Sequence, residues 1–546
     1  MNDTDQGTGL AISRRGLIKL AGALTLSVSA FPAGGRAFAE TAETLRIIHP
    51  IFDMDWSALR GGGMAYGWNT LCNASPMYFD GEGKLHPYAV DRWEANEDRS
   101  EWTFTIAKGA VFSDGSPITS DDIKGSLELI AMPSTRHQRV DLVLPDVVGY
   151  DEMMAGAAKE LAGVGIKDER TVVVKLSKPD PVFYMRLASQ LTPIVKVSKV
   201  RDGNGEEIFE WWTPEKEPVY SGPFRPTAMN LDAGELTFER NEAFFGTRPK
   251  LSTIEIRSIE DPIAATALLA SGQFDAHTDF STPTLIEDLG EDFANGPLIP
   301  RGHHFWLNAR RAPMDDINVR KALIMAIDRD ELMRVAFPKG PHVKADQILD
   351  AVPGVDAAFQ PYPYDPEAAK KALAESSYGG PEKLPRIMMV GISNPSNEVA
   401  AQYIAEQWRK VLGITAVDIK PQIDSYAGPD QGSVQIFRDD VGTRVPDPVV
   451  YLVGSIHSTS SNAINKLGGY KNEKVDAALD AAAVLAADDP ERLRLAQEAQ
   501  RLFRDDWTFI PWYHEVMSKL AMPQVKNIVK NLDIQVAEPW NLEVVR

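Results

Sequence analysis

Segments with the two-residue period of a β-strand dominate the first half of the chain, and this pattern constrains the fold more than any other feature. In residues 101–106, Trp102, Phe104 and Ile106 alternate with polar residues, which is typical of a half-buried strand. Three later segments have the same alternating pattern, and each is bounded by Gly, Pro, Asp or Asn: TVVVKL (171–176), ELTFER (235–240) and STIEIRSI (252–259). The sequence therefore predicts several strands before residue 300.

The second half of the chain has helical periodicity instead. Two segments carry apolar residues at i, i+3 and i+4, which places them on one face of a helix: Val319, Ala322, Leu323, Ala326 and Ile327, and then Val475, Ala478, Leu479, Ala482 and Leu485. Two Asp-Pro-Glu sequences, at 365–367 and 489–491, predict helix starts, because the aspartate caps free backbone donors and proline is tolerated in the first turn. The sequence therefore predicts a mixed α/β class, in which strand periodicity gives way to helical periodicity near residue 300.

The acidic stretch VFSDGSPITSDDIKGSL (111–127) is interpreted as a turn followed by a helix start. Asp114-Gly115 is a turn dipeptide after an apolar strand, and Thr119 precedes Asp122 by the spacing of a capping box. A calcium loop of the EF-hand type needs acidic residues at alternating early positions and glutamate at the twelfth. Counted from Asp114, the third, fifth and twelfth positions are Ser, Ile and Gly, so the calcium interpretation fails.

The first 39 residues are expected to form an export signal. Arg14 and Arg15 precede a mildly apolar run (17–31), and Ala37-Phe38-Ala39 has the small residues of a cleavage site. Paired arginines indicate the twin-arginine type, and the run is shorter than the roughly 20 apolar residues that a membrane span needs. We expect cleavage near Ala39, a periplasmic location, and no later membrane-spanning segment.

Charge and cysteine content exclude several classes of protein. The 546-residue chain has a formal net charge of -20, whereas nucleic-acid binding requires a basic face. Cys72 is the only cysteine, so the chain has neither an internal disulfide nor a cysteine metal cluster. A chain of this length is expected to divide into two or more domains.

Motifs for catalysis are missing from the sequence. HExxH, GxSxG and GxxxxGK[ST] do not occur, and GGGMAYG (61–67) lacks the spacing of a dinucleotide-binding loop. His303 and His304 are adjacent in a predicted strand, so they point to opposite faces and cannot easily hold one metal. We predict no catalytic residue, no metal and no cofactor. The alternative is a secreted hydrolase or redox enzyme exported in folded form.

The stretch YAVDRWEANEDRSEWTFTIAKGAVFSDGSPITSDDIKGSL (88–127) closely resembles family 5 periplasmic solute-binding proteins of ABC importers, which include dipeptide-, oligopeptide- and nickel-binding proteins. Later blocks match in the same order: YSGPF, FERNEAFFGTRPKLSTIEIR, ASGQFD, NVRKALIMAIDRDEL, YDPEAAKKAL, PDPVVYL and DDWTFIPWY. Together these ordered blocks are spread over about 450 residues of the chain.

The resemblance implies a two-lobe α/β fold of the periplasmic-binding-protein type, with an extra subdomain inserted in the first lobe. The first lobe would comprise residues 40–300 and 514–546, the insert 75–218, and the second lobe 301–513. Such a protein captures a small solute between its lobes and delivers it to the permease and ATPase subunits in the membrane. A monomer is expected, and a role in sensing or as a chaperone is an alternative use of the same fold.

The resemblance also suggests cleft residues. In peptide-binding relatives, an aspartate in a W-x-x-D-x-x-D-P-like stretch neutralises the peptide's amino terminus. The corresponding stretch here is QIFRDDVGTRVPDP, in which Phe437 takes roughly the place of the tryptophan, and Asp439 and Asp440 are the acidic candidates. Arg444 stands three positions before the Asp-Pro. It would favour a carboxylate or phosphate in the cleft, unless it pairs with one of these aspartates and faces away.

Further candidates follow from their positions in the family pattern. Two are in a loop of the second lobe, one follows the presumed start of that lobe, two follow the glycine-rich loop, and one could contact a metal or an anion: Ser393, Asn394, Trp306, Tyr66, Trp68 and His457. Peptide-like or amino-acid-conjugate solutes are expected from the family. Metal chelates, opine-like compounds and oligosaccharides remain alternatives.

Overall fold

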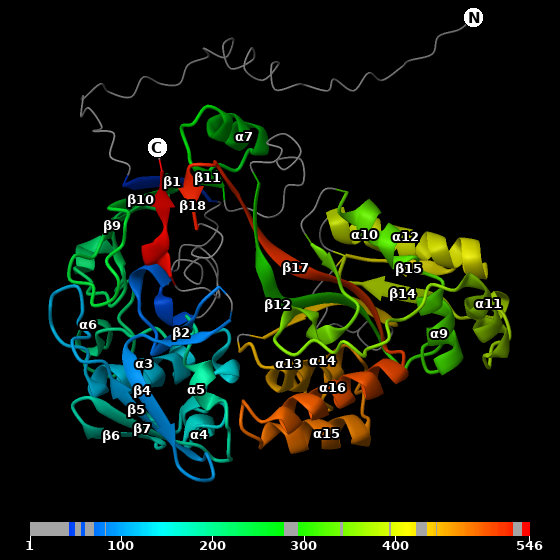
Figure 1. Ribbon diagram of the computed structural model, residues 1–546, viewed down its shortest axis with the longest axis horizontal. Coiled ribbons are helices and arrows are strands. Elements are labelled where there is room, and N and C mark those ends of the chain that lie inside the picture. Colours follow the sequence, from blue (N-terminus) through cyan, green and yellow to red (C-terminus); the bar gives the residue numbers. More distant parts are fainter. Residues whose placement is uncertain are drawn as a thin grey trace, which may run out of the picture.

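The computed structural model describes residues 43–49, 56–60, 70–81, 83–277, 293–338, 342–392, 395–421, 434–443, 445–527 and 538–545. The molecule has two lobes side by side (Figure 1). The expected export signal lies outside the described residues. No helix within the described part of the chain is long and apolar enough to cross a membrane.

One large sheet extends through both lobes. Among the described residues it has eleven strands, in the order β15-β14-β16-β12-β17-β11-β1-β10-β9-β8, with β13 paired to β17. Their bounds are β1 Thr44–Ile48, β8 Phe224–Asn230, β9 Glu235–Arg240, β10 Thr253–Arg257, β11 Ala276–His277, β12 Phe293–Leu307, β13 Val343–Lys344, β14 Ile387–Val390, β15 Val417–Ile419, β16 Ile436–Gly442 and β17 Phe509–Ala521.

Strands β12 and β17 connect the lobes (Figure 1). Phe293 of β12 pairs with Leu520 of β17, next to the first-lobe strand β11, whereas residues 301–307 pair with β16 in the second lobe. The β12–β17 register shifts at three places. Such bulges bend a strand pair and increase its twist, which suits two strands that leave one lobe and enter the other.

The first lobe has its own apolar core, which extends from Leu45 to Val544 and includes residues on both sides of the second lobe in sequence. A second sheet in this lobe has the order β4-β5-β7-β6. The remaining elements of the lobe are β2 Met77–Phe79, β3 Leu85–Pro87, β4 Val90–Ala95, β5 Glu101–Ile106, β6 Val164–Asp168, β7 Thr171–Lys175, β18 Val525–Lys526, β19 Glu543–Val544, α3 Ser120–Ala131, α4 Tyr150–Met154, α5 Phe183–Arg186, α6 Val197–Val200 and α7 Pro262–Ala270.

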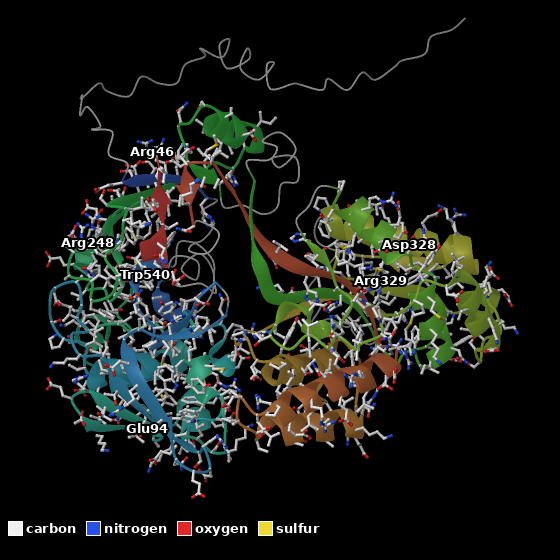
Figure 2. The ribbon with its side chains drawn as sticks, viewed as in Figure 1. Arg46, Glu94, Arg248, Asp328, Arg329 and Trp540 are labelled. Atoms are coloured by element: carbon white, nitrogen blue, oxygen red, sulfur yellow. The ribbon has the colours of Figure 1, made fainter. Side chains whose placement is uncertain are left out.

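The C-terminal segment returns to the first lobe. Trp540, labelled in Figure 2, is 6% exposed and lies edge-on to Tyr78, with ring centroids 5.3 Å apart. It also stacks on Phe244. These contacts join the end of the chain to strand β2 and to the segment after β9.

The second lobe has a separate core that extends from Phe305 to Tyr513. Helices surround its part of the large sheet: α9 Ile317–Met325, α10 Arg329–Ala336, α11 Pro366–Glu375, α12 Pro395–Leu412, α13 Pro448–Ile456, α14 Ser461–Asn465, α15 Glu473–Ala483 and α16 Pro490–Asp505. The two-lobe α/β fold is thus confirmed. The expected boundaries at 300/301 and 513/514, and those of the insert, stay predictions.

The acidic stretch at 111–127 forms the predicted turn and helix start. Gly115 has φ +80°, and the Asp114 carboxylate accepts from the Ser116 N–H at 2.9 Å. At the start of α3, the Asp122 carboxylate accepts from both the backbone N–H and the hydroxyl of Thr119, at 3.0 and 2.8 Å. These side chains close a corner of the first lobe.

The helical stripe at 319–327 is buried as predicted, but its last two residues, Ala326 and Ile327, lie in the turn after the helix. Helix α9 ends at Met325, and Asp328 (Figure 2) caps a new helix, α10, by accepting from Asp330 and Glu331 N–H. A side chain that caps free backbone donors favours a helix start over continuation. Asp365 and Asp489 cap α11 and α16 as predicted.

A buried ion pair fixes the start of α13. Asp447 caps the helix by accepting from Val450 N–H, and its two oxygens accept from Arg492 Nε and Nη2 at 3.0 and 2.7 Å. The side chain of Arg492 is 2% exposed and that of Asp447 is 5% exposed. Arg492 also donates to the carbonyls of Ala482 and Leu485 at the end of α15. One arginine therefore connects the start of α13 to the end of α15.

We predict that Asp447→Ala destabilises the protein by about 3–5 kcal/mol, because it leaves the buried Arg492 charge without its partner. Asp489→Ala is the matched control. It removes a cap that accepts from Glu491 N–H, and should cost about 1 kcal/mol. Urea unfolding of both variants measures the difference, and equal losses would contradict the role of the ion pair.

Candidate functional site

Five ionisable side chains converge where β12, β16 and β17 pair, next to the crossing between the lobes. We name Arg301, His303, Arg438, Asp440 and Glu515 the charged cluster. Alternate residues of a strand share one face, so Arg301 and His303 lie together on β12, as do Arg438 and Asp440 on β16. The register places His303 opposite Asp440, which brings the two pairs onto the same face of the sheet.

Hydrogen bonds and ion pairs join the members of the charged cluster into a chain. Arg438 Nη2 lies 2.7 Å from His303 Nδ1, and His303 Nε2 lies 3.3 Å from Glu515 Oε2. Arg301 lies 3.6 Å from both Glu515 Oε2 and Asp440 Oδ2. The side chains of Arg301 and Asp440 are 28% and 38% exposed, so the charged cluster is open to solvent on the side of these two residues.

The electrostatics of the cluster keep its acids charged. Burial opposes ionisation of Asp440, but Arg301, His303 and Arg438 outweigh it and lower the pKa of Asp440. Burial likewise opposes ionisation of Glu515, and the His303 hydrogen bond together with Arg301 lowers the pKa of that carboxyl. Both carboxylates are therefore charged at neutral pH.

Arg438 has a different environment. It is 9% exposed, its guanidinium lies over the Trp512 ring at 5.4 Å, and its Nε has no hydrogen-bond partner within the described residues. No carboxylate of the described part of the chain lies within 4.0 Å of it, although the Asp440 charge is felt through space. Burying an ion without a direct partner is costly. Arg438 is therefore the member of the cluster best suited to receive an anion.

The two predicted acidic residues are both engaged with cations. Asp439 points to the face of β16 opposite Asp440, where its carboxylate pairs with Lys466 at 2.5 Å. Asp440 pairs with Arg301. The structure thus places only Asp440 in the charged cluster.

The predicted aromatic residues Phe437 and Trp306 lie opposite each other in the β12–β16 register. They are 4% and 0% exposed, and Trp306 stacks on Phe509 with ring centroids 5.7 Å apart. Both rings belong to the second core, on the sheet face opposite the charged cluster. In this structure they support the strands and present almost no surface to a solute.

His457 lies away from the cluster, at the C-terminal end of α13. Its Nδ1 lies 2.7 Å from Thr459 Oγ1, and its Nε2 lies 3.3 Å from Asp480 and 3.7 Å from Asp476. Among the residues that the structure describes, no three or more His, Cys, Asp or Glu side chains are arranged to hold a metal. The remaining predicted residues lie outside the described ranges: Tyr66, Trp68, Ser393, Asn394 and Arg444.

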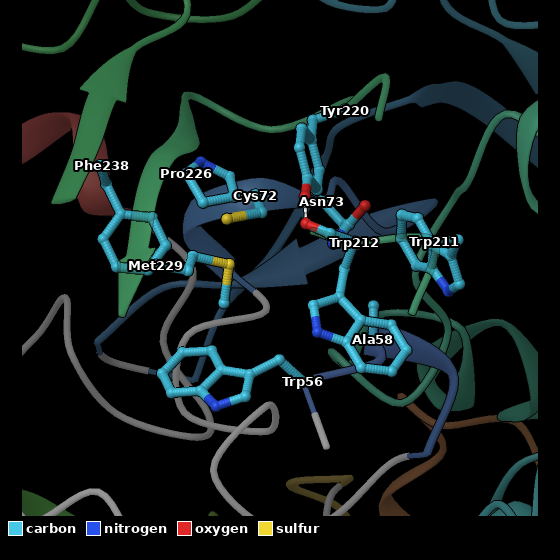
Figure 3. Close-up of a pocket in the computed structure, with 10 residues that line it drawn as sticks. All are labelled: Trp56, Ala58, Cys72, Asn73, Trp211, Trp212, Tyr220, Pro226, Met229 and Phe238. Atoms are coloured by element: carbon cyan, nitrogen blue, oxygen red, sulfur yellow. Dashed lines mark hydrogen bonds between the residues drawn. The ribbon is translucent and has the colours of Figure 1, made fainter. Parts of the chain in front are cut away.

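The first lobe contains a small aromatic pocket of about 30 Å³ (Figure 3). Its walls come from two stretches of the lobe, 56–73 and 211–238: Trp56, Ala58, Cys72, Asn73, Trp211, Trp212, Tyr220, Pro226, Met229 and Phe238. The Tyr220 hydroxyl donates to the Trp212 carbonyl at 2.8 Å, and burial raises the pKa of the Cys72 thiol. A buried neutral thiol is unreactive, so the pocket offers an apolar surface and no nucleophile.

Sequence reasoning missed Arg301, Arg438 and Glu515, as well as the tryptophans of the pocket. The alternation of FRDD would have placed Arg438 and Asp440 on one face of a strand. Nothing local to the sequence indicates that Arg301 and Glu515 face them, because that depends on the pairing of three strands far apart in the chain.

A family model described as "Bacterial extracellular solute-binding proteins, family 5 Middle" matches residues 84–463. The periplasmic oligopeptide-binding protein OppA of Salmonella typhimurium is 25% identical over 464 residues, which is 82% of each chain. The glutathione-binding protein GsiB of Salmonella choleraesuis is 24% identical over 466 residues, 82% of this chain and 84% of GsiB.

Solved structures agree in fold. The unliganded open form of the periplasmic murein tripeptide binding protein MppA has a TM-score of 0.77 at 21% identity, covering 92% of this chain and 98% of MppA. NikA from Brucella suis in complex with Fe(III)-EDTA has a TM-score of 0.74 at 20% identity, covering 92% of this chain and 99% of NikA. Because the family model spans well over half of the sequence, the chain belongs to the bacterial extracellular solute-binding proteins of family 5.

Proposed function

We propose that this protein is the solute-binding component of an ABC importer and that its solute carries an anionic group, which binds at the charged cluster. The observation that carries the proposal is Arg438, a buried guanidinium with no carboxylate partner among the described residues. A guanidinium matches a carboxylate or phosphate through its planar set of donors. Arg301, which is 28% exposed in the same cluster, would add a second positive charge.

Peptide-like or amino-acid-conjugate solutes are the class we favour. OppA, GsiB and MppA are named for oligopeptides, glutathione and a murein tripeptide, all of which carry carboxylates. The EDTA of the NikA complex is also a polycarboxylate. The aromatic pocket of the first lobe would accept a small apolar part of such a solute. Binding would close the lobes around the ligand.

We further propose that the protein acts as a monomer in the periplasm, exported through a twin-arginine signal that is cleaved near Ala39, and docks in its loaded form on a permease with ATPase subunits. Arg14 and Arg15 support the route of export. Family members are binding proteins, and no bond is made or broken in the proposed role.

Native mass spectrometry of protein purified without denaturation tests the proposed function directly. We expect a bound small molecule that ionises as an anion and that leaves when the protein is unfolded. A panel of peptides and glutathione in a thermal-shift assay provides a second measurement. Protein that carries no solute and responds to no member of the panel would contradict the proposal.

We predict that Arg438→Met weakens binding of tri-alanine by at least about tenfold, because a hydrogen-bonded charge pair contributes well over 1 kcal/mol. Binding of tri-alanine amide, which lacks the carboxylate, should change little. Isothermal titration calorimetry measures both. Arg494→Gln is the matched control, since Arg494 is exposed and, among the described residues, pairs only with Glu491 and Glu498 in α16. Equal losses for the acid and the amide would remove Arg438 from the anion site.

Arg444→Ala in the same assay tests the residue that the sequence singled out.

We predict that replacing Arg14 and Arg15 together with lysine abolishes export, because the twin-arginine route reads the arginine pair itself. Cell fractionation should then find the uncleaved chain in the cytoplasm, whereas Arg36→Lys, outside the pair, should leave export intact. Mass measurement of the exported protein should place its N-terminus at Glu40. Periplasmic protein from the double variant would show that another route carries it.

A further inference from the structure

His303 occupies the central position of the charged cluster, and its two ring nitrogens have different partners. The partner of Nδ1 is Arg438 Nη2 at 2.7 Å, and a guanidinium nitrogen can only donate. Nδ1 must therefore accept and carry no proton. The proton of the neutral ring is then on Nε2, which donates to the Glu515 carboxylate at 3.3 Å. The geometry selects one tautomer.

Two contacts hold the ring in this orientation. His303 stacks on Tyr513 with ring centroids 4.2 Å apart and planes 4° apart, so the ring cannot tilt. Glu515 lies 3.6 Å from Arg301 and is held by it. The position of the Nδ1 lone pair is therefore fixed by residues on two strands.

Charged and titratable groups face His303 from every element packed against it. On its own face they come from β12, β16, β17 and the segment before β13: Arg301, Arg438, Asp440, Tyr513, Glu515 and His342. His304 and His514 point away from this face and act on His303 through space. Burial lowers the pKa of His303, the Glu515 hydrogen bond opposes this, and Arg438 adds to the lowering. The balance favours the neutral ring at pH 7.

We propose that His303 is the positioning residue of the anion site: its neutral ring holds Arg438 by accepting from Nη2 and so sets the preference of the charged cluster for anionic solutes. The inference rests on the proposed function, in which Arg438 receives the solute. Without this acceptor, the guanidinium loses its 2.7 Å contact and keeps only the Trp512 ring and the Tyr513 hydroxyl as neighbours among the described residues. A donor at Nδ1 would face the donor of Arg438 and displace it.

Nuclear magnetic resonance of the full chain with ¹⁵N-labelled histidine tests the tautomer without any ligand. His303→Asn identifies the His303 signals by their loss. We expect an unprotonated Nδ1 and a protonated Nε2 at pH 7. A protonated Nδ1, in either the neutral or the charged ring, would overturn the proposal.

Two variants separate positioning from packing. In His303→Asn, the amide oxygen is two bonds from Cβ, as Nδ1 is, so it can still accept from Arg438. His303→Phe keeps an aromatic ring against Tyr513 but has no acceptor. With ¹⁵N-arginine labelling, and Arg438→Lys to assign the signal, we expect a slowly exchanging Arg438 Nη2–H in the wild type and in the Asn variant, and its loss in the Phe variant.

The same variants test specificity with tri-alanine and tri-alanine amide as probes. His303→Phe should reduce the preference for the acid by about tenfold, the size of one hydrogen bond to a charged group, whereas His303→Asn should retain it. If both variants behave alike in exchange and binding, His303 has only a packing role and the proposal fails. If the wild type shows no preference for the acid but the tautomer and exchange results hold, the proposed solute class is wrong while His303 still positions Arg438.

Discussion

The antiparallel pairing of β12 with β17 is the constraint on which the rest of the structure depends. These strands have fifteen and thirteen residues, and they make one continuous sheet from two lobes that have separate apolar cores. A residue near the crossing is therefore held by both strands at once. Arg301 and His303 on β12, with Tyr513 and Glu515 on β17, occupy this position. Ionisable side chains are placed there with a rigidity that a loop would not provide.

The charges in this region are arranged so that one cation, Arg438, has no carboxylate within 4.0 Å among the described residues. Asp440 and Glu515 share Arg301 at 3.6 Å, while Arg438 contacts a neutral imidazole and an indole face. The through-space attraction of Asp440 offsets part of the cost of burying Arg438. It does not supply the hydrogen-bonding oxygens that a guanidinium takes from a carboxylate, and a solute can supply them.

Much of the fold could be predicted from the sequence, because its signals are local. Strand alternation located β5, β7, β9 and β10, and the Asp-Pro-Glu sequences located the starts of α11 and α16. The stripe at 319–327 revealed burial, but not the helix break that the Asp328 cap introduces. The charged cluster was beyond such reasoning, since it depends on the pairing of β12 with β16 and β17 across more than a hundred residues. The family pattern indicated the stretch around 437–444, and the side chain that stands out within it is Arg438.

In the proposed role, the pairing of the two aspartates would also determine which solute charge the site favours. A cationic amino terminus would have to displace Lys466 from Asp439 or Arg301 from Asp440, and both ion pairs are already formed. For the Arg301–Asp440 pair, whose side chains are partly exposed, exchanging one cation for another changes the free energy little, because exposed pairs contribute about 1 kcal/mol or less. An anion at Arg438 instead meets a buried guanidinium whose desolvation cost is already present in the free protein. In the proposed role the gain on binding would therefore be larger for the anion, because Arg438 is the group that the charged cluster leaves without a carboxylate among the described residues.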